Sequence, residues 1–181
     1  DIAKSFCFEN TELAHMLLEK ITHITIEYVK KKIEAGVDAV QIFDSWGGVL
    51  SHTDYNIFSF PYIKKINDAL KALKPIIIYP KGCWHAINSY SKIGASGLGI
   101  DWSCSARNAR YLSGNNITLQ GNMDPSRLFS PKNELIKLTK EMLNEFGNQK
   151  YIANLGHGIL PNTPVDNVKV FVDTIKSFSN D

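Results

Sequence analysis

Two short polar segments, each flanked by glycines, carry the residue types best suited to chemistry. DSWGG (44–48) and NLGHG (154–158) each follow a short apolar run. Ser45 can donate or accept a hydrogen bond, and its neighbouring glycines allow a ligand to approach the backbone closely. His157 lies between two glycines on a bare loop, where no apolar face would bury it. Ser45 and His157 are therefore candidate ligand-binding residues, and capping of the following turn is the alternative role for Asp44 and Ser45.

Other constellations of reactive residues are weaker. Cys83, His85, Cys104 and His157 fall near strand ends, and three such ligands could form an open zinc site. Neither a C-x-x-C nor an H-x-C spacing supports that site, so we predict no metal. No serine or cysteine has a histidine and an acid in a recognisable local motif, and no glycine run has phosphate-binding spacing.

The remaining histidines have structural interpretations. His15 and His23 lie within a leading helix and are assigned to its surface or its packing. His52 is assigned to a loop, without an obvious partner.

Helices and strands that would position these residues alternate along the whole chain. A leading helix begins at Asn10 or Thr11 and ends at Gly36, and its apolar face carries Leu13, Leu17, Ile21, Ile24 and Tyr28. Short apolar strands are predicted at 37–43, 75–79, 97–100, 117–120 and 151–154, with a loop at 44–54 and a turn-rich loop at 121–125. A helix follows each strand. The first, after Pro61, has an apolar face at Ile63, Ile66, Leu70 and Leu73; the second runs from the loop at 80–83 to Ile93, and the third ends at Leu112. The fourth, after Ser130-Pro131, has its apolar face at Leu135, Leu138, Met142 and Phe146, and the fifth, which starts at 163–166, at Val168, Phe171, Val172, Ile175 and Phe178.

Short apolar strands separated by amphipathic helices indicate an α/β protein with a parallel sheet. Each strand is followed at once by polar or glycine residues: Asp44-Ser45, Lys81-Gly82, Asp101-Trp102, Gly121-Asn122 and Gly156-His157. Such a set suits a ring of loops around one mouth, which favours a βα (TIM) barrel over a doubly wound sheet. A complete barrel needs about 250 residues, and the chain has 181. We therefore expect an incomplete barrel, formed by a leading helix and the last five βα units.

Composition excludes several classes of protein. Hydrophobic residues make up 44% and charged residues 21%, which is typical of a globular protein. Three cysteines are too few for a disulfide framework and indicate a cytoplasmic protein. A net charge of +2 with dispersed lysines predicts no nucleic-acid partner. No apolar run is long enough for a membrane span, and the first residues do not resemble a signal peptide.

Four segments resemble the uroporphyrinogen decarboxylase family. They are FDSWGGVLS (43–51), GLGIDWS (97–103), LQGNMDP (119–125) and YIANLGHGILPNTP (151–164), in the family's order and spacing. The resemblance implies a βα barrel about twice as long as this chain. Residues 1–181 would then be the carboxyl-terminal part of a single barrel domain whose amino-terminal part is absent.

The resemblance also implies a reaction. The family converts the four acetate side chains of uroporphyrinogen to methyl groups, giving coproporphyrinogen without a cofactor or metal. Ser45 and His157 match family substrate contacts by motif. The family's acidic catalytic residue, its substrate tyrosine and its arginine-rich segment would all lie before Asp1, so no catalytic residue is expected in this chain. The intact enzyme is expected to be a cytoplasmic homodimer, and this chain alone is expected to be inactive.

Arginine content points the same way, because an octacarboxylate calls for guanidinium groups. The chain has only Arg107, Arg110 and Arg127, and the first two lie on a short helix behind the mouth. Two alternatives stay open at this point. One is a zinc-dependent methyltransferase of the same superfamily acting with a corrinoid partner, for which Cys83 lies in the relevant loop but H-x-C is missing. The other is a non-enzymatic half-barrel that only associates with another half.

Overall fold

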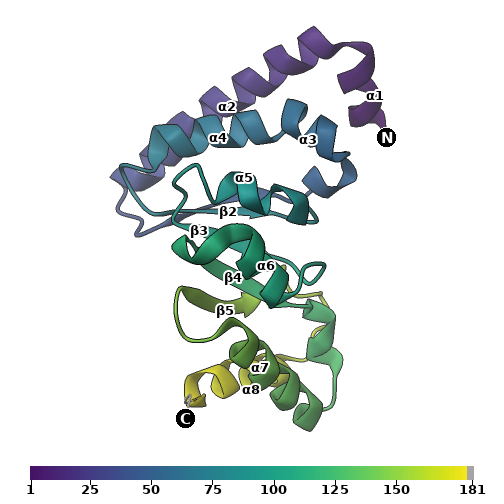
Figure 1. The fold of residues 1–181 in the computed structure, drawn as a ribbon, viewed down its shortest axis with the longest axis vertical. Helices are drawn as coiled ribbons and strands as arrows, with labels where there is room; N and C mark the ends of the chain where they lie inside the picture. The colour runs from purple at the N-terminus through teal and green to yellow at the C-terminus, as the bar shows by residue number, and fades with distance from the viewer. Residues whose placement is uncertain (179–181) are drawn as a thin grey trace. The chain divides into compact units, whose positions relative to one another are not determined.

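Five strands form the framework in the computed structural model, which describes residues 1–178. They are β1 (Val40–Asp44), β2 (Ile76–Pro80), β3 (Gly97–Ile100), β4 (Thr118–Met123) and β5 (Tyr151–Leu155). Their order in the sheet is β1-β2-β3-β4-β5, which is their order in the chain (Figure 1). A doubly wound sheet reverses its strand order at a switch point, whereas a βα barrel does not. The predicted α/β fold of an incomplete barrel is confirmed.

The chain divides into two compact units, Asp1–Leu98 and Gly99–Asp181. In the first unit, parallel β1 and β2 place Val40 opposite Ile76 and Asp44 opposite Pro80. Its helices are α1 (Ile2–Glu9), α2 (Thr11–Glu34), α3 (His52–Phe58), α4 (Phe60–Leu70) and α5 (Ile87–Tyr90). Helices α2 and α4 lie side by side (Figure 1). Ile63, Ile66 and Leu70 of α4 are buried, as their spacing predicts.

The apolar face predicted for the leading helix is exposed. Leu13, Leu17, Ile21, Ile24 and Tyr28 are each at least half exposed. The buried positions of α2 are instead the small or β-branched Ala14, Thr22 and Val29. The periodicity therefore identifies the helix correctly, but the side that packs within this unit is the one with the smaller side chains, which allow closer helix packing.

The second unit contains α6 (Ala106–Ser113), α7 (Lys132–Phe146) and α8 (Val165–Ser177). Helices α7 and α8 pack side by side (Figure 1). Parallel β4 and β5 pair from Leu119 opposite Tyr151 to Met123 opposite Leu155. Its buried core includes Leu119, Leu128, Leu135, Phe146 and Phe171.

Several predicted boundaries are wrong, and two of them are wrong because segments interpreted as loops form regular structure. The loop at 44–54 contains the 3-10 turn η1 (Gly47–Val49) and the start of α3. Strand β4 continues through Gly121 and Asn122, since β5 pairs with those residues too. Pro131, not Ser130, caps α7, and Leu73 lies beyond the end of α4.

Burial also differs at the last helix, where Phe171 and Thr174 are buried and Val172 is exposed. No helix in the described part of the chain is both long and apolar enough to cross a bilayer.

Candidate active-site edge

Ser45 occupies the turn that directly follows β1, and it is half-buried. The register of β1 and β2 brings Asp44 opposite Pro80, the last residue of β2. The main-chain amide of Lys81 donates to the carbonyl oxygen of Asp44 at 3.1 Å. Ser45 therefore lies at the carboxyl edge of the parallel strands, as predicted, and this is the edge at which ligands bind in such sheets.

The side chain of Asp44 holds the turn in place. The hydroxyl of Ser59 donates a 2.6 Å hydrogen bond to the Asp44 carboxylate. A Cβ on Gly47 would lie 2.8 Å from the carboxyl carbon of Asp44 and 2.6 Å from the ring of Tyr55. Only glycine fits between these two side chains without displacing one of them. Asp44 thus fixes the turn through Ser59, a partner 15 residues away that local sequence patterns do not reveal.

The second glycine of the turn also packs against the protein itself. A Cβ on Gly48 would lie 2.9 Å from the carbonyl oxygen of Lys81 and 3.1 Å from the Cα of Gly82. The sequence had suggested that these glycines leave room for a ligand. In the structure Gly47 packs against Asp44 and Tyr55, and Gly48 allows the loops after β1 and β2 to meet.

Two buried tyrosines lie behind the turn. The hydroxyl oxygens of Tyr55 and Tyr90 are 2.7 Å apart, and neither side chain is accessible to solvent. Burial raises the pKa of both hydroxyls far above the usual tyrosine value, and the nearby Asp44 raises both further. Both tyrosines are therefore neutral, and their mutual hydrogen bond satisfies two polar groups in the core.

A mostly apolar cavity of about 330 Å³ opens beside the turn. Its lining includes Cys7, Asp44, Trp46, Phe58 and Ser59. Lys4 also lines it, and its ammonium group donates to the carbonyl oxygen of Val49 at 2.9 Å, which ties α1 to η1.

His157 lies two residues beyond β5, in the second unit, and is half-buried. The preceding Gly156 is buried, and a Cβ there would lie 3.0 Å from both the Cα of Asp101 and the ring of Trp102. The Gly156 amide donates to the carbonyl oxygen of Met123 at 2.7 Å. The expectation of a bare loop is therefore wrong, because this loop is packed against the ends of its neighbouring strands. Its predicted place at the carboxyl edge of β5 is confirmed.

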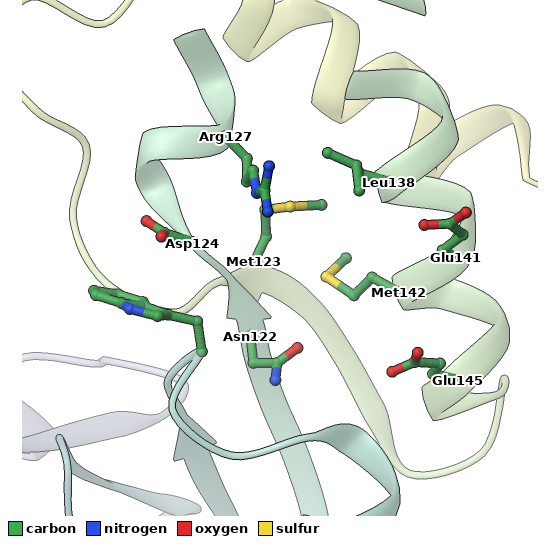
Figure 2. A pocket seen from close by; sticks show the side chains of 9 residues that line it. Asn122, Met123, Asp124, Arg127, Leu138, Glu141, Met142 and Glu145 are labelled. Carbon is green, nitrogen blue, oxygen red and sulfur yellow. The ribbon is translucent and has the colours of Figure 1, made fainter. Parts of the chain in front are cut away.

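A second cavity, of about 320 Å³, lies between the end of β4 and helix α7 (Figure 2). Arg127 lines it together with three acidic side chains, Asp124, Glu141 and Glu145. Figure 2 shows Arg127 near Met123 on one wall and the two glutamates along α7 on the other. Three carboxylates against one guanidinium disfavour a polyanionic ligand here.

The other arginines serve the fold or the surface. The guanidinium of Arg110 donates to the carbonyl oxygens of Gln149 at 2.9 Å and Lys150 at 3.0 Å. Burial lowers the pKa of Arg110. Arg107 is exposed on the same helix. The chain has few arginines that could bind an octacarboxylate, and one of them, Arg110, is already bound to main-chain carbonyl oxygens.

Histidines other than His157 differ from their interpretation in one case. His15 packs as expected, with its Nδ1 2.5 Å from the Tyr62 hydroxyl and its ring stacked on Phe58. His52, in contrast, begins α3 and has a partner, since its Nδ1 lies 3.1 Å from Nδ1 of His85. The sequence could not show this pair because its members are 33 residues apart.

Known proteins resemble this chain over nearly its whole length. The family described as "Uroporphyrinogen decarboxylase (URO-D)" matches residues 1–178. The chain belongs to the uroporphyrinogen decarboxylase family. A Flavobacterium johnsoniae protein named uroporphyrinogen decarboxylase is 61% identical over 178 residues, which are 98% of this chain and 52% of that protein. Proteins of the same name from Christiangramia forsetii and Schizosaccharomyces pombe are 58% and 37% identical, again over 98% of this chain and 52% and 53% of theirs.

The chain thus spans about half the length of the uroporphyrinogen decarboxylases it matches. Among solved structures, a methyltransferase from Methanosarcina mazei superposes with a TM-score of 0.79 over 96% of this chain and 52% of that one, at 22% identity. At that identity the likeness concerns the fold. The family match favours the decarboxylase resemblance over the methyltransferase alternative.

Proposed function

We propose that this chain is the carboxyl-terminal part of a single βα-barrel enzyme that decarboxylates the acetate side chains of uroporphyrinogen to give coproporphyrinogen. The observation that carries the proposal is the family match over residues 1–178, together with polar residues at successive strand ends. In this proposal Ser45 and His157 bind the substrate, and neither is the catalytic acid.

The chemistry asks the protein for electrostatic work. Protonation of a pyrrole ring makes it an electron sink, so the bond to the carboxylate breaks and carbon dioxide leaves. The resulting methylene carbon takes up a proton to become a methyl group, and the ring then loses the proton it gained, which restores the neutral pyrrole. The protein must stabilise the cationic ring and hold the carboxylates in position. Hydrogen-bond donors such as Ser45 and His157 suit the second task, while the acid that stabilises the cation would come from the missing part.

Exposed apolar surfaces in the first unit support an incomplete barrel. Phe43 of β1 is 61% exposed, although strands of parallel sheets are normally covered on both faces. The apolar face of α2 is exposed as well. Upstream βα units would cover both. The complete protein is further proposed to be a cytoplasmic homodimer.

The test is reconstitution from two halves. This chain is co-expressed with the amino-terminal half of the Flavobacterium relative, and coproporphyrinogen formed from uroporphyrinogen is measured. Activity is expected only when both halves are present. A soluble, associated pair without activity would contradict the proposal, and activity of this chain alone would contradict the placement of the acid upstream.

A further inference from the structure

His52 and His85 form a pair that the decarboxylase proposal does not use. His52 is the first residue of α3, and His85 lies in the 3-10 turn η2 (Trp84–Ala86). Their Nδ1 atoms are 3.1 Å apart, their ring centroids are 5.0 Å apart, and the ring planes meet at 68°. At this distance the Nδ1–H of one ring donates a hydrogen bond to the Nδ1 lone pair of the other ring.

The separation of the two nitrogens also fits a shared metal ion. Zinc binds imidazole nitrogen at about 2.0–2.1 Å. An ion at that distance from two atoms 3.1 Å apart makes an N–metal–N angle of about 100°. This lies between the right angle of an octahedral site and the wider angle of a tetrahedral one. We propose that His52 and His85 chelate a late first-row divalent metal ion of the zinc type through their Nδ1 atoms.

The surroundings of the pair suit this chemistry. His52 is exposed, so an ion can reach it from solvent, and waters can complete the coordination. His85 is half-buried and held edge-on against the Tyr55 ring, with centroids 5.4 Å apart.

The donor set determines the class of ion. Two imidazoles favour zinc, nickel or copper over magnesium or calcium, which prefer oxygen ligands. Among residues 1–178 no group of three or more histidine, cysteine or acidic side chains is placed to hold a metal. The proposed site is therefore an open two-histidine site. It would join α3 to η2, the segments that follow β1 and β2, and so stabilise the folded state increasingly as the metal concentration rises above the Kd.

Calorimetric titration with zinc chloride tests the site in the complete protein, with any histidine tag removed. One saturable zinc site is expected, and magnesium chloride should give none. His52→Ala and His85→Ala should each weaken zinc binding at least about tenfold. The midpoint of thermal unfolding should rise with zinc in the parent protein and not in the double variant.

His23→Ala is the matched control, because His23 is an exposed histidine on α2. It should bind zinc as the parent does. His52→Gln, with circular dichroism to verify folding, replaces the alanine variant if that variant misfolds. Unchanged zinc affinity in folded His52 and His85 variants would overturn the proposal, as would the lack of saturable binding in the parent. Both outcomes are independent of decarboxylase activity.

Discussion

The Ser59 hydroxyl and the Asp44 carboxylate, 2.6 Å apart, join the start of α4 to the end of β1. This contact places a fixed acceptor directly before Ser45. Gly47 packs against the same carboxylate. The proposed substrate-binding turn is thus positioned by residues that would not contact the substrate themselves.

Gly47→Ala should destabilise the protein by about 1–3 kcal/mol, the range for forcing extra atoms into a packed site. The added methyl group would overlap the Tyr55 ring and the Asp44 carboxyl group, neither of which is the free end of a flexible chain. Urea unfolding of the complete protein measures the change. Gly158→Ala is the control, since a Cβ there meets no atom within 4 Å. Equal stability of the two variants would show that the Gly47 contact can relax.

Stability should decline at alkaline pH because of Tyr55 and Tyr90. Burial raises the pKa of both in the folded state, so the folded protein keeps these protons while the unfolded chain loses them near pH 10. The stabilisation is therefore complete below about pH 10 and falls as the pH rises above it. Urea unfolding between about pH 8 and 11 should show the decline. Tyr55→Phe/Tyr90→Phe should lessen the decline without abolishing it, because burial also raises the pKa of Tyr151. Tyr111→Phe, at an 84% exposed position, should leave the decline unchanged.

Ser45→Ala and His157→Ala should each lower kcat/KM for uroporphyrinogen by about 10- to 100-fold in the complete enzyme. That range corresponds to the loss of one hydrogen bond to a charged group. Thermal unfolding should change little, because both side chains are half-buried at loop positions. Unchanged kinetics in both variants would remove these residues from the proposed site.

Arg110→Ala should cost about 1.5–3 kcal/mol of stability, because a charged donor to the Gln149 and Lys150 carbonyl oxygens is lost. The exposed Arg107→Ala on the same helix should change stability by less than about 0.5 kcal/mol. Chemical denaturation of both variants makes the comparison. Equal, small losses would mean that water replaces the guanidinium at those carbonyls.

Local patterns in the sequence determined the fold class and the strand-end position of the predicted site. Apolar runs such as PIIIY (75–79) located the strands in the sequence. Parallel strands that pair bring their carboxyl ends to one edge of the sheet. Ser45 and His157 could be placed at that edge for this reason. The end of β4 was less predictable, because pairing with β5 extends the strand beyond what its own residues favour.

Only the tertiary structure decided what lies against these elements. The apolar stripe of α2 predicted a buried face, yet the described fold buries a neighbouring face with smaller residues. Asp44 with Ser59, Gly47 with Tyr55, and His52 with His85 are pairs brought together by the docking of helices and loops on the strands. A sequence records each partner's chemistry but not the distance between them, since that distance depends on packing of the whole unit.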